Sequence, residues 1–167
     1  MGDQDKSPKD RGWPTDSMAF RYAVIDLASA VALRPVVPRL LSAVAEPLLA
    51  RSMPLQLLEV GPWLVHLLDT PEVESTLAGY GIAVPWGYFV HSKVDILSLR
   101  QSLRKFNLAK LPDRPKEVLF RYWDPRVLKI FLDRASTVQR GQFFAWIDRV
   151  EWPDGTLCEK ANADEYR

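Results

Sequence analysis

The stretch from residue 118 to residue 132 constrains the fold most, because it predicts a β-strand that runs directly into an α-helix. Residues 118–123 alternate with a period of two and carry apolar groups on both faces, as in a buried strand. Asp124 then offers a carboxylate to the free N–H groups of a helix start, and Pro125 suits the first helical position, where no N–H is needed. Helical spacing predicts that the buried face of this helix consists of Val127, Leu128, Ile130 and Phe131.

Two arginines bracket this junction. Arg121 lies on the predicted buried strand, where an unpaired guanidinium would be costly. We expect Arg121 to pair with a carboxylate, either Asp124 or Asp26, because structural ion pairs are commoner than functional ones. The alternative is that Arg121 and Arg126 line a docking surface for an acidic or polar partner segment.

Composition narrows the class of protein. A chain of 167 residues, 47% of them hydrophobic, is long enough for one domain with a core and is not a disordered protein. Its net charge of +1 argues against nucleic acid as the main partner, since binding to phosphates normally requires a basic excess. The single cysteine, Cys158, excludes an intramolecular disulfide and fits a reducing cytoplasm. No signal peptide or membrane-spanning apolar run is visible, so we expect a cytoplasmic protein that does not bind membranes.

Thirteen prolines divide the chain into short elements and argue against a bundle of long helices. We predict an α/β fold of the α+β type, a single domain with a mixed β-sheet flanked by helices. The predicted strands are 20–26, 63–68, 86–91, 118–123 and 146–152. The predicted helices are 36–45, 71–78, 93–106, the helix after Asp124 and one capped by Ser136 with Gln139. Residues 1–17 are predicted to be a disordered tail, 18–157 the folded domain and 158–167 a frayed tail.

Local patterns refine three of these elements. Ser92 is expected to cap the helix 93–106. Gly87 is expected to permit close packing of a neighbouring segment, which is a commoner role for a strand glycine than a ligand site. Residues 108–111 are expected to form a hairpin with the strand at 118, through the turn at 112–115.

The long helix carries a basic ridge. Arg100 and Arg104 stand one turn apart near Lys105, on a face different from the predicted buried one. Such a ridge is most often a solvated face that complements the helix C-terminus. A partner-binding ridge is the alternative, and a nucleic-acid binder using this ridge is a further hypothesis.

Catalytic patterns are missing from the sequence. It contains no nucleophile elbow, no phosphate-binding glycine loop and no zinc-like cluster of cysteine and histidine. We therefore predict that the protein is not an enzyme and binds no metal or cofactor. An alternative is a small-molecule or hydrolytic enzyme that uses Asp26, His66 or Asp124 at strand ends, where ligand sites gather in α/β sheets. For Asp26 we favour a turn-capping role, and for His66 a hydrogen-bonded place in the core.

Four segments, taken in order, resemble the adaptor or effector-chaperone domain of the bacterial type VI secretion system, first catalogued as a domain of unknown function, DUF4123. They are residues 22–26, residues 62–65, Trp86-Gly87 with Ser92, and residues 119–127. The fourth segment is the most specific and contains the motif residues Phe120, Arg121, Tyr122, Asp124 and Pro125. Asp26 ends the first segment, and the resemblance extends over about 20–152. The chain departs from the family pattern at Ser102, where relatives usually carry a histidine.

This resemblance implies an adaptor rather than an enzyme. Such proteins bind a toxic effector in the cytoplasm of a Gram-negative bacterium and help to load it onto a VgrG-type spike protein at the tip of the secretion tube. Many relatives carry a second helical lobe after this domain. The six tryptophans would provide aromatic side chains for a binding surface, although most of them are expected in the core. We predict an interface that combines Arg126 and Trp123 with exposed parts of the ridge formed by Arg100 and Arg104.

Overall fold

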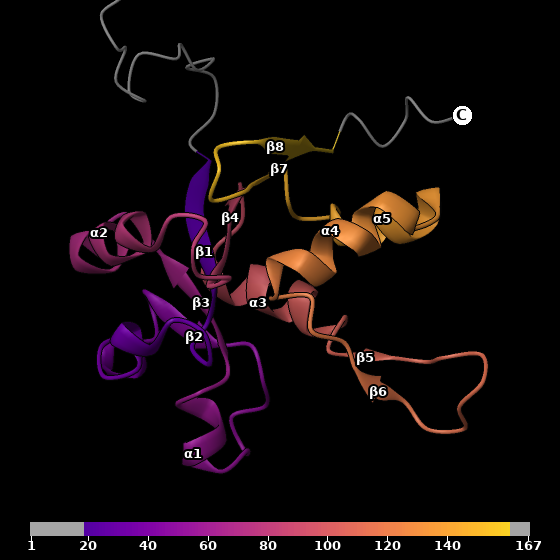
Figure 1. Ribbon diagram of the computed structural model, residues 1–167, viewed down its shortest axis with the longest axis horizontal. Helices are drawn as coiled ribbons and strands as arrows, with labels where there is room; N and C mark the ends of the chain where they lie inside the picture. The colour runs from indigo at the N-terminus through magenta and orange to yellow at the C-terminus, as the bar shows by residue number, and fades with distance from the viewer. Residues whose placement is uncertain (1–18, 161–167) are drawn as a thin grey trace, which may run out of the picture.

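A six-stranded antiparallel sheet runs through the middle of the structure (Figure 1). The computed structural model describes residues 19–160. The strand order is β2-β3-β1-β4-β7-β8. These strands are β1 (Phe20–Asp26), β2 (Ala45–Pro47), β3 (Pro62–His66), β4 (Gly87–Ser92), β7 (Arg149–Glu151) and β8 (Leu157–Glu159).

Strand β1 lies inside the sheet, between β3 and β4. Its side chains alternate between two apolar clusters, with Tyr22 and Val24 in one and Ala23 and Ile25 in the other. This alternation is the period of two that a strand with two buried faces requires. Both faces of the sheet must therefore be covered by the rest of the chain.

The two faces receive different covers, which Figure 1 shows on opposite sides of the sheet. One face is covered by α2 (Pro71–Tyr80) and by the 3-10 turns η2 (Val31–Leu33) and η3 (Val37–Arg39). The other is covered by α3 (Ile96–Arg104), α4 (Pro125–Arg134) and α5 (Thr137–Phe143). The short helix α1 (Leu55–Leu58) precedes β3, and a hairpin of β5 (Leu108–Ala109) and β6 (Val118–Leu119) projects from the body.

The predicted fold class is confirmed: a single α+β domain with a sheet flanked by helices. We predicted a mixed sheet, but every strand pair in the large sheet is antiparallel. The predicted strands that begin at residues 20, 63 and 86 are present as β1, β3 and β4, and the hairpin at 108–119 is also confirmed. The capping box of Ser136 and Gln139 starts α5 as predicted.

Three local predictions were wrong. The strand predicted at 118–123 ends at residue 119, because the chain turns and directs Tyr122 and Trp123 into the core. The helix predicted at 36–45 is replaced by the single 3-10 turn η3 and the start of β2, which fits a segment interrupted by prolines. Ser92 does not cap α3: it ends β4, and Asp95 accepts the N–H groups of the first helical turn instead.

The predicted tails are only partly covered by the structure. The N-terminal tail, 1–17, lies outside the described residues. The C-terminal tail was predicted to begin at 158, but Leu157–Glu159 form β8 and pair with β7. The sheet therefore continues past the predicted boundary.

Gly87 is required by the pairing of β4 with β1. Its φ of 139° is one that side chains with a Cβ rarely adopt. A Cβ at this position would lie 1.8 Å from the carbonyl oxygen of Val24, so the two strands could not approach as they do. The predicted role of Gly87 in close packing is confirmed.

We expect Gly87→Ala to lower the free energy of unfolding by about 3 kcal/mol or more, because strain and backbone overlap add together. Gly79→Ala is a matched control in α2, where a Cβ meets nothing within 4 Å. That variant should raise the free energy of unfolding by about 0.5–1 kcal/mol. Urea denaturation of both variants measures the difference, and equal stability of the two would contradict this role for Gly87.

Candidate functional site

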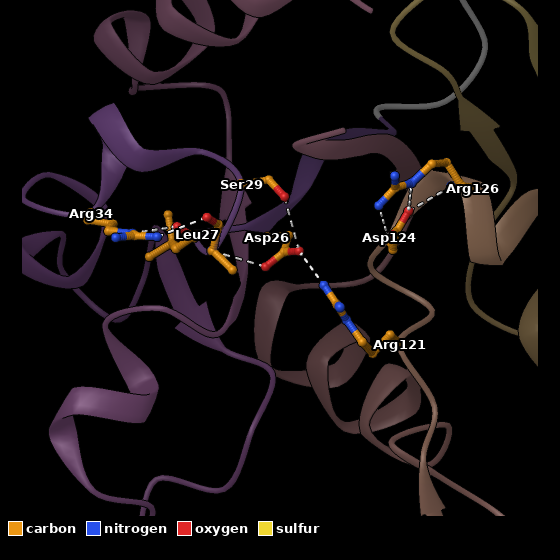
Figure 2. A network of polar contacts seen from close by, with 8 residues as sticks. Asp26, Leu27, Ser29, Arg34, Arg121, Asp124 and Arg126 are labelled. Atoms are coloured by element: carbon orange, nitrogen blue, oxygen red, sulfur yellow. Dashed lines mark hydrogen bonds and ion pairs between the residues drawn. The ribbon is translucent and has the colours of Figure 1, made fainter. Parts of the chain in front are cut away.

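A carboxylate at the end of β1 fixes the loop that follows. The Asp26 carboxylate accepts the backbone N–H of Ala28 at 3.1 Å and the Ser29 hydroxyl at 3.5 Å (Figure 2). Arg34 donates from its Nε to the carbonyl of Leu27 at 2.8 Å, which holds the same loop from its other side. The predicted capping role of Asp26 is confirmed.

Arg121 joins this loop to the segment before α4. Its terminal nitrogen lies 3.0 Å from Asp26 Oδ2, so the predicted ion pair forms with Asp26. The Arg121 side chain remains 50% exposed while the Asp26 side chain is 2% exposed. The same guanidinium therefore neutralises a buried carboxylate and presents positive charge to the surface.

Asp124 starts α4 and binds Arg126 at the same time. Its Oδ1 accepts the backbone N–H of Arg126 at 3.0 Å, and its two oxygens accept from the guanidinium at 3.0 and 2.7 Å. Hydrogen bonding from the Arg126 side chain is the largest cause that lowers the pKa of Asp124 below its usual value. Burial raises this pKa, and the hydrogen bond from the backbone N–H of Arg126 lowers it. Asp124 in turn raises the pKa of Arg126. The Arg126 side chain is 70% exposed, so it carries this charge at the surface.

Arg100 does not belong to an exposed ridge as predicted. Its side chain is 13% exposed, and its Nε donates to the carbonyl of Pro47 at 2.7 Å and lies 3.5 Å from the buried carboxylate of Glu46. Burial is the main cause of a lowered pKa for Arg100. Asn107 makes a parallel contact, donating to the carbonyl of Leu48 at 2.8 Å. These side chains join α3 and the residues after it to the edge strand β2.

The other predicted partner residues divide between core and surface. Trp123 is 3% exposed and packs against the ring of Tyr122 at 5.3 Å between centroids, so it is a core residue and not a surface contact. Arg104 is partly buried. Among the motif residues, Trp86 is fully buried and Pro125 is buried at the first position of α4. Arg126 therefore remains as the exposed member of the predicted interface.

An open apolar groove of about 320 Å³ runs along the outer side of α4. It is lined by Phe120, Val127, Ile130, Phe131, Arg134, Ala135 and Gln139. The face of α4 that enters the core is instead made of Pro125, Leu128 and Leu132. The predicted buried face was therefore wrong for Ile130, whose exposed fraction is 58%.

The sequence signal of this groove is the number of apolar residues on α4. Helix α4 has apolar residues on two sides, and one short helix cannot direct both toward the same core. Asp124, which caps the helix, and Trp123, which is buried before it, fix the rotation of α4 so that Leu128 faces inward. The surplus apolar side is left at the surface.

Two side chains of the predicted enzyme site, His66 and Asp26, lie at opposite ends of one strand pairing. His66 lies opposite Tyr22 in the pairing of β1 with β3, whereas Asp26 lies opposite Pro62 at the other end of that pairing. Asp124 is engaged by Arg126. Within residues 19–160, no group of three or more acidic, histidine or cysteine side chains is placed to hold a metal ion. No helix in that range combines the length and the apolar character needed to cross a membrane.

This architecture defines an α+β domain whose sheet is covered on both faces and whose α4 carries exposed charge beside an apolar groove. Residues 21–142 match the family model described as Domain of unknown function (DUF4123), and the chain belongs to this family. The match runs from β1 into α5 and so includes Asp26, Arg121 and Asp124. Comparisons with curated proteins and with solved structures gave no match.

The lowered pKa of Asp124 predicts an acid-sensitive stability. Because the folded-state pKa lies below the unfolded value, the contact with Arg126 stabilises the fold above the unfolded pKa, and this stabilisation is lost as the pH falls through the folded pKa. We expect Asp124→Asn to be less stable than wild type at neutral pH and to lose less stability on acidification. Urea denaturation from neutral pH to about pH 2 measures both slopes. If the free energy of unfolding depended on pH equally in wild type and Asp124→Asn, the stabilising role of the Asp124 carboxylate would be contradicted.

The pair between Asp26 and Arg121 should be measurable as a coupling energy. We expect a double-mutant cycle with Asp26→Asn and Arg121→Met to give about 1 to 2 kcal/mol, a modest value because Arg121 is half exposed. Equilibrium unfolding of wild type, both single variants and the double variant provides the four free energies. A coupling energy near zero would mean that Arg121 does not hold the end of β1.

Proposed function

We propose that this protein is an adaptor, or effector chaperone, of a type VI secretion system. It binds a toxic effector in the cytoplasm and helps to load that effector onto a VgrG-type spike protein. The observation that carries the proposal is membership of the DUF4123 family over residues 21–142, together with the resemblance of this domain to adaptors of that system. On this proposal the protein acts by binding proteins, without catalysis, cofactor, nucleic acid or membrane.

The surface of the domain supports a protein partner. Large apolar side chains are exposed on and near α4 and α5, including Ile130 at 58% and Val138 at 69%. Exposed apolar side chains gathered in one region are a common mark of protein-binding surfaces. Arg126 adds an exposed arginine beside them, and arginine is frequent among residues that dominate binding energy.

Co-expression provides the test. We expect the full chain, captured by an affinity tag and passed over a sizing column, to elute as a stoichiometric complex with one of the type VI effectors encoded in the same genome. Addition of the spike protein should extend this complex. If the chain elutes alone with every such effector and spike protein, the adaptor function is wrong.

Variants of Arg126 refine this test. Arg126→Glu would place a second carboxylate beside Asp124, so Arg126→Gln is the cleaner variant. It should weaken effector binding about tenfold while the domain stays folded. Arg39→Gln is a matched control, since Arg39 is exposed on η3 across the sheet. Equal binding of both variants would remove Arg126 from the interface.

A further inference from the structure

The outer side of α4 presents two arginines with an apolar residue between them. Arg126, Ile130 and Arg134 occupy positions i, i+4 and i+8, which fall on one line of a helix. At 1.5 Å of rise per residue, the two arginines are about 12 Å apart along the axis. All three residues are exposed. Arg134 also lines the groove beside Ile130.

The charge that lines the groove has one sign. Arg134 is the charged residue that lines the groove, and no carboxylate is among the lining residues. Among the other charged residues of α4, Lys129 lies 3.8 Å from Asp154 and over the ring of Trp152, and Asp133 is exposed but is not among the residues that line the groove. An apolar channel with Arg134 in its lining, and with Arg126 exposed at the start of the same helix, favours an apolar segment that carries two anions.

Both arginines can bind such anions. Arg126 uses its Nε and one terminal nitrogen on Asp124, so its other terminal nitrogen has N–H groups free for a second carboxylate. Arg134 forms no ion pair among the residues that the structure describes. The two charges are therefore available at the surface, one toward each end of α4.

The groove favours a helical occupant over an extended one. Its walls are formed largely by α4 and the start of α5, whose backbone groups are bonded within the helices. An extended segment would leave its own N–H and C=O groups unpaired against this apolar wall, whereas a helix satisfies them internally. Helix-in-groove binding places apolar residues at i, i+3 or i+4 in the channel.

We propose that this groove binds an amphipathic helix of the effector, with two carboxylates about eight residues apart and apolar side chains between them. One carboxylate pairs with Arg126 and the other with Arg134, while the apolar residues contact Ile130 and Phe131. This inference rests on the proposed adaptor function and deepens it by assigning the surface that receives the effector.

A designed peptide tests the groove directly. The probe is a helical peptide of about 20 residues, with glutamates at i and i+8 and leucines at i+1, i+4 and i+5. The control peptide has lysines in place of the two glutamates. We expect the glutamate peptide to bind the full chain at least about tenfold more tightly than the lysine peptide, as measured by fluorescence anisotropy. Equal affinities, or no binding of the glutamate peptide at millimolar protein, would overturn the proposal.

Variants of the chain locate the binding. Ile130→Asp and Arg134→Glu change exposed side chains, so both variants should fold. Each should weaken binding of the glutamate peptide at least about tenfold. Ile82→Asp is the matched control, because Ile82 is 77% exposed in the turn after α2 and should leave affinity unchanged. Retained affinity in both groove variants would overturn the proposal.

The same variants separate this inference from the adaptor function. In the co-expression assay, wild type and Ile82→Asp should retain the effector while Ile130→Asp loses it. An effector complex that survives Ile130→Asp and Arg134→Glu would overturn the groove assignment and leave the adaptor function standing. Absence of any complex with wild type would overturn the adaptor function and, with it, the identity of the occupant.

Discussion

The backbone of β1 is hydrogen-bonded to β3 on one side and to β4 on the other, and the domain is arranged around that double pairing. Because the side chains of β1 enter two separate apolar clusters, both faces of the sheet must be covered. Helices from different parts of the chain provide the two covers, as Figure 1 shows. At the end of β1 the buried Asp26 is matched by Arg121, so the strand, its loop and the segment before α4 are held in one place (Figure 2).

Local chemistry made much of this fold predictable from the sequence. The alternation in β1, the Asp124-Pro125 start of α4 and the capping box at Ser136 each depend on residues close in the chain, and each was predicted. The region 36–45 was not predictable in the same way. Its apolar residues have helical spacing, but the prolines admit only short turns. Val37 and Ala45 are buried in the apolar cluster to which α2 also contributes, so tertiary packing stabilises this segment.

The part of the candidate site that could be predicted is the part in which an isolated buried charge would be energetically costly. That cost predicted a carboxylate partner for Arg121, either Asp124 or Asp26, and in the structure the partner is Asp26, 95 positions away. The role of Arg100 could not be predicted because its partners, two backbone carbonyls and the carboxylate of Glu46, lie 51 positions away or more. A side chain gives no sign in the sequence that it will bind a distant carbonyl. The rotation of α4 about its axis could not be predicted for a similar reason, because tertiary packing decides which of its two apolar sides faces the core.

The contacts of Arg100 and Asn107 have a consequence for self-association. Strand β2 is a border of the sheet, and such borders invite pairing with strands of other chains, the first step toward aggregation. Here the carbonyls of Pro47 and Leu48 are already occupied by those two side chains, and Pro47 has no N–H to donate. These contacts protect the Pro47 end of this border from pairing with a foreign strand. Two copies of the domain are therefore hindered from joining their sheets at this end of β2.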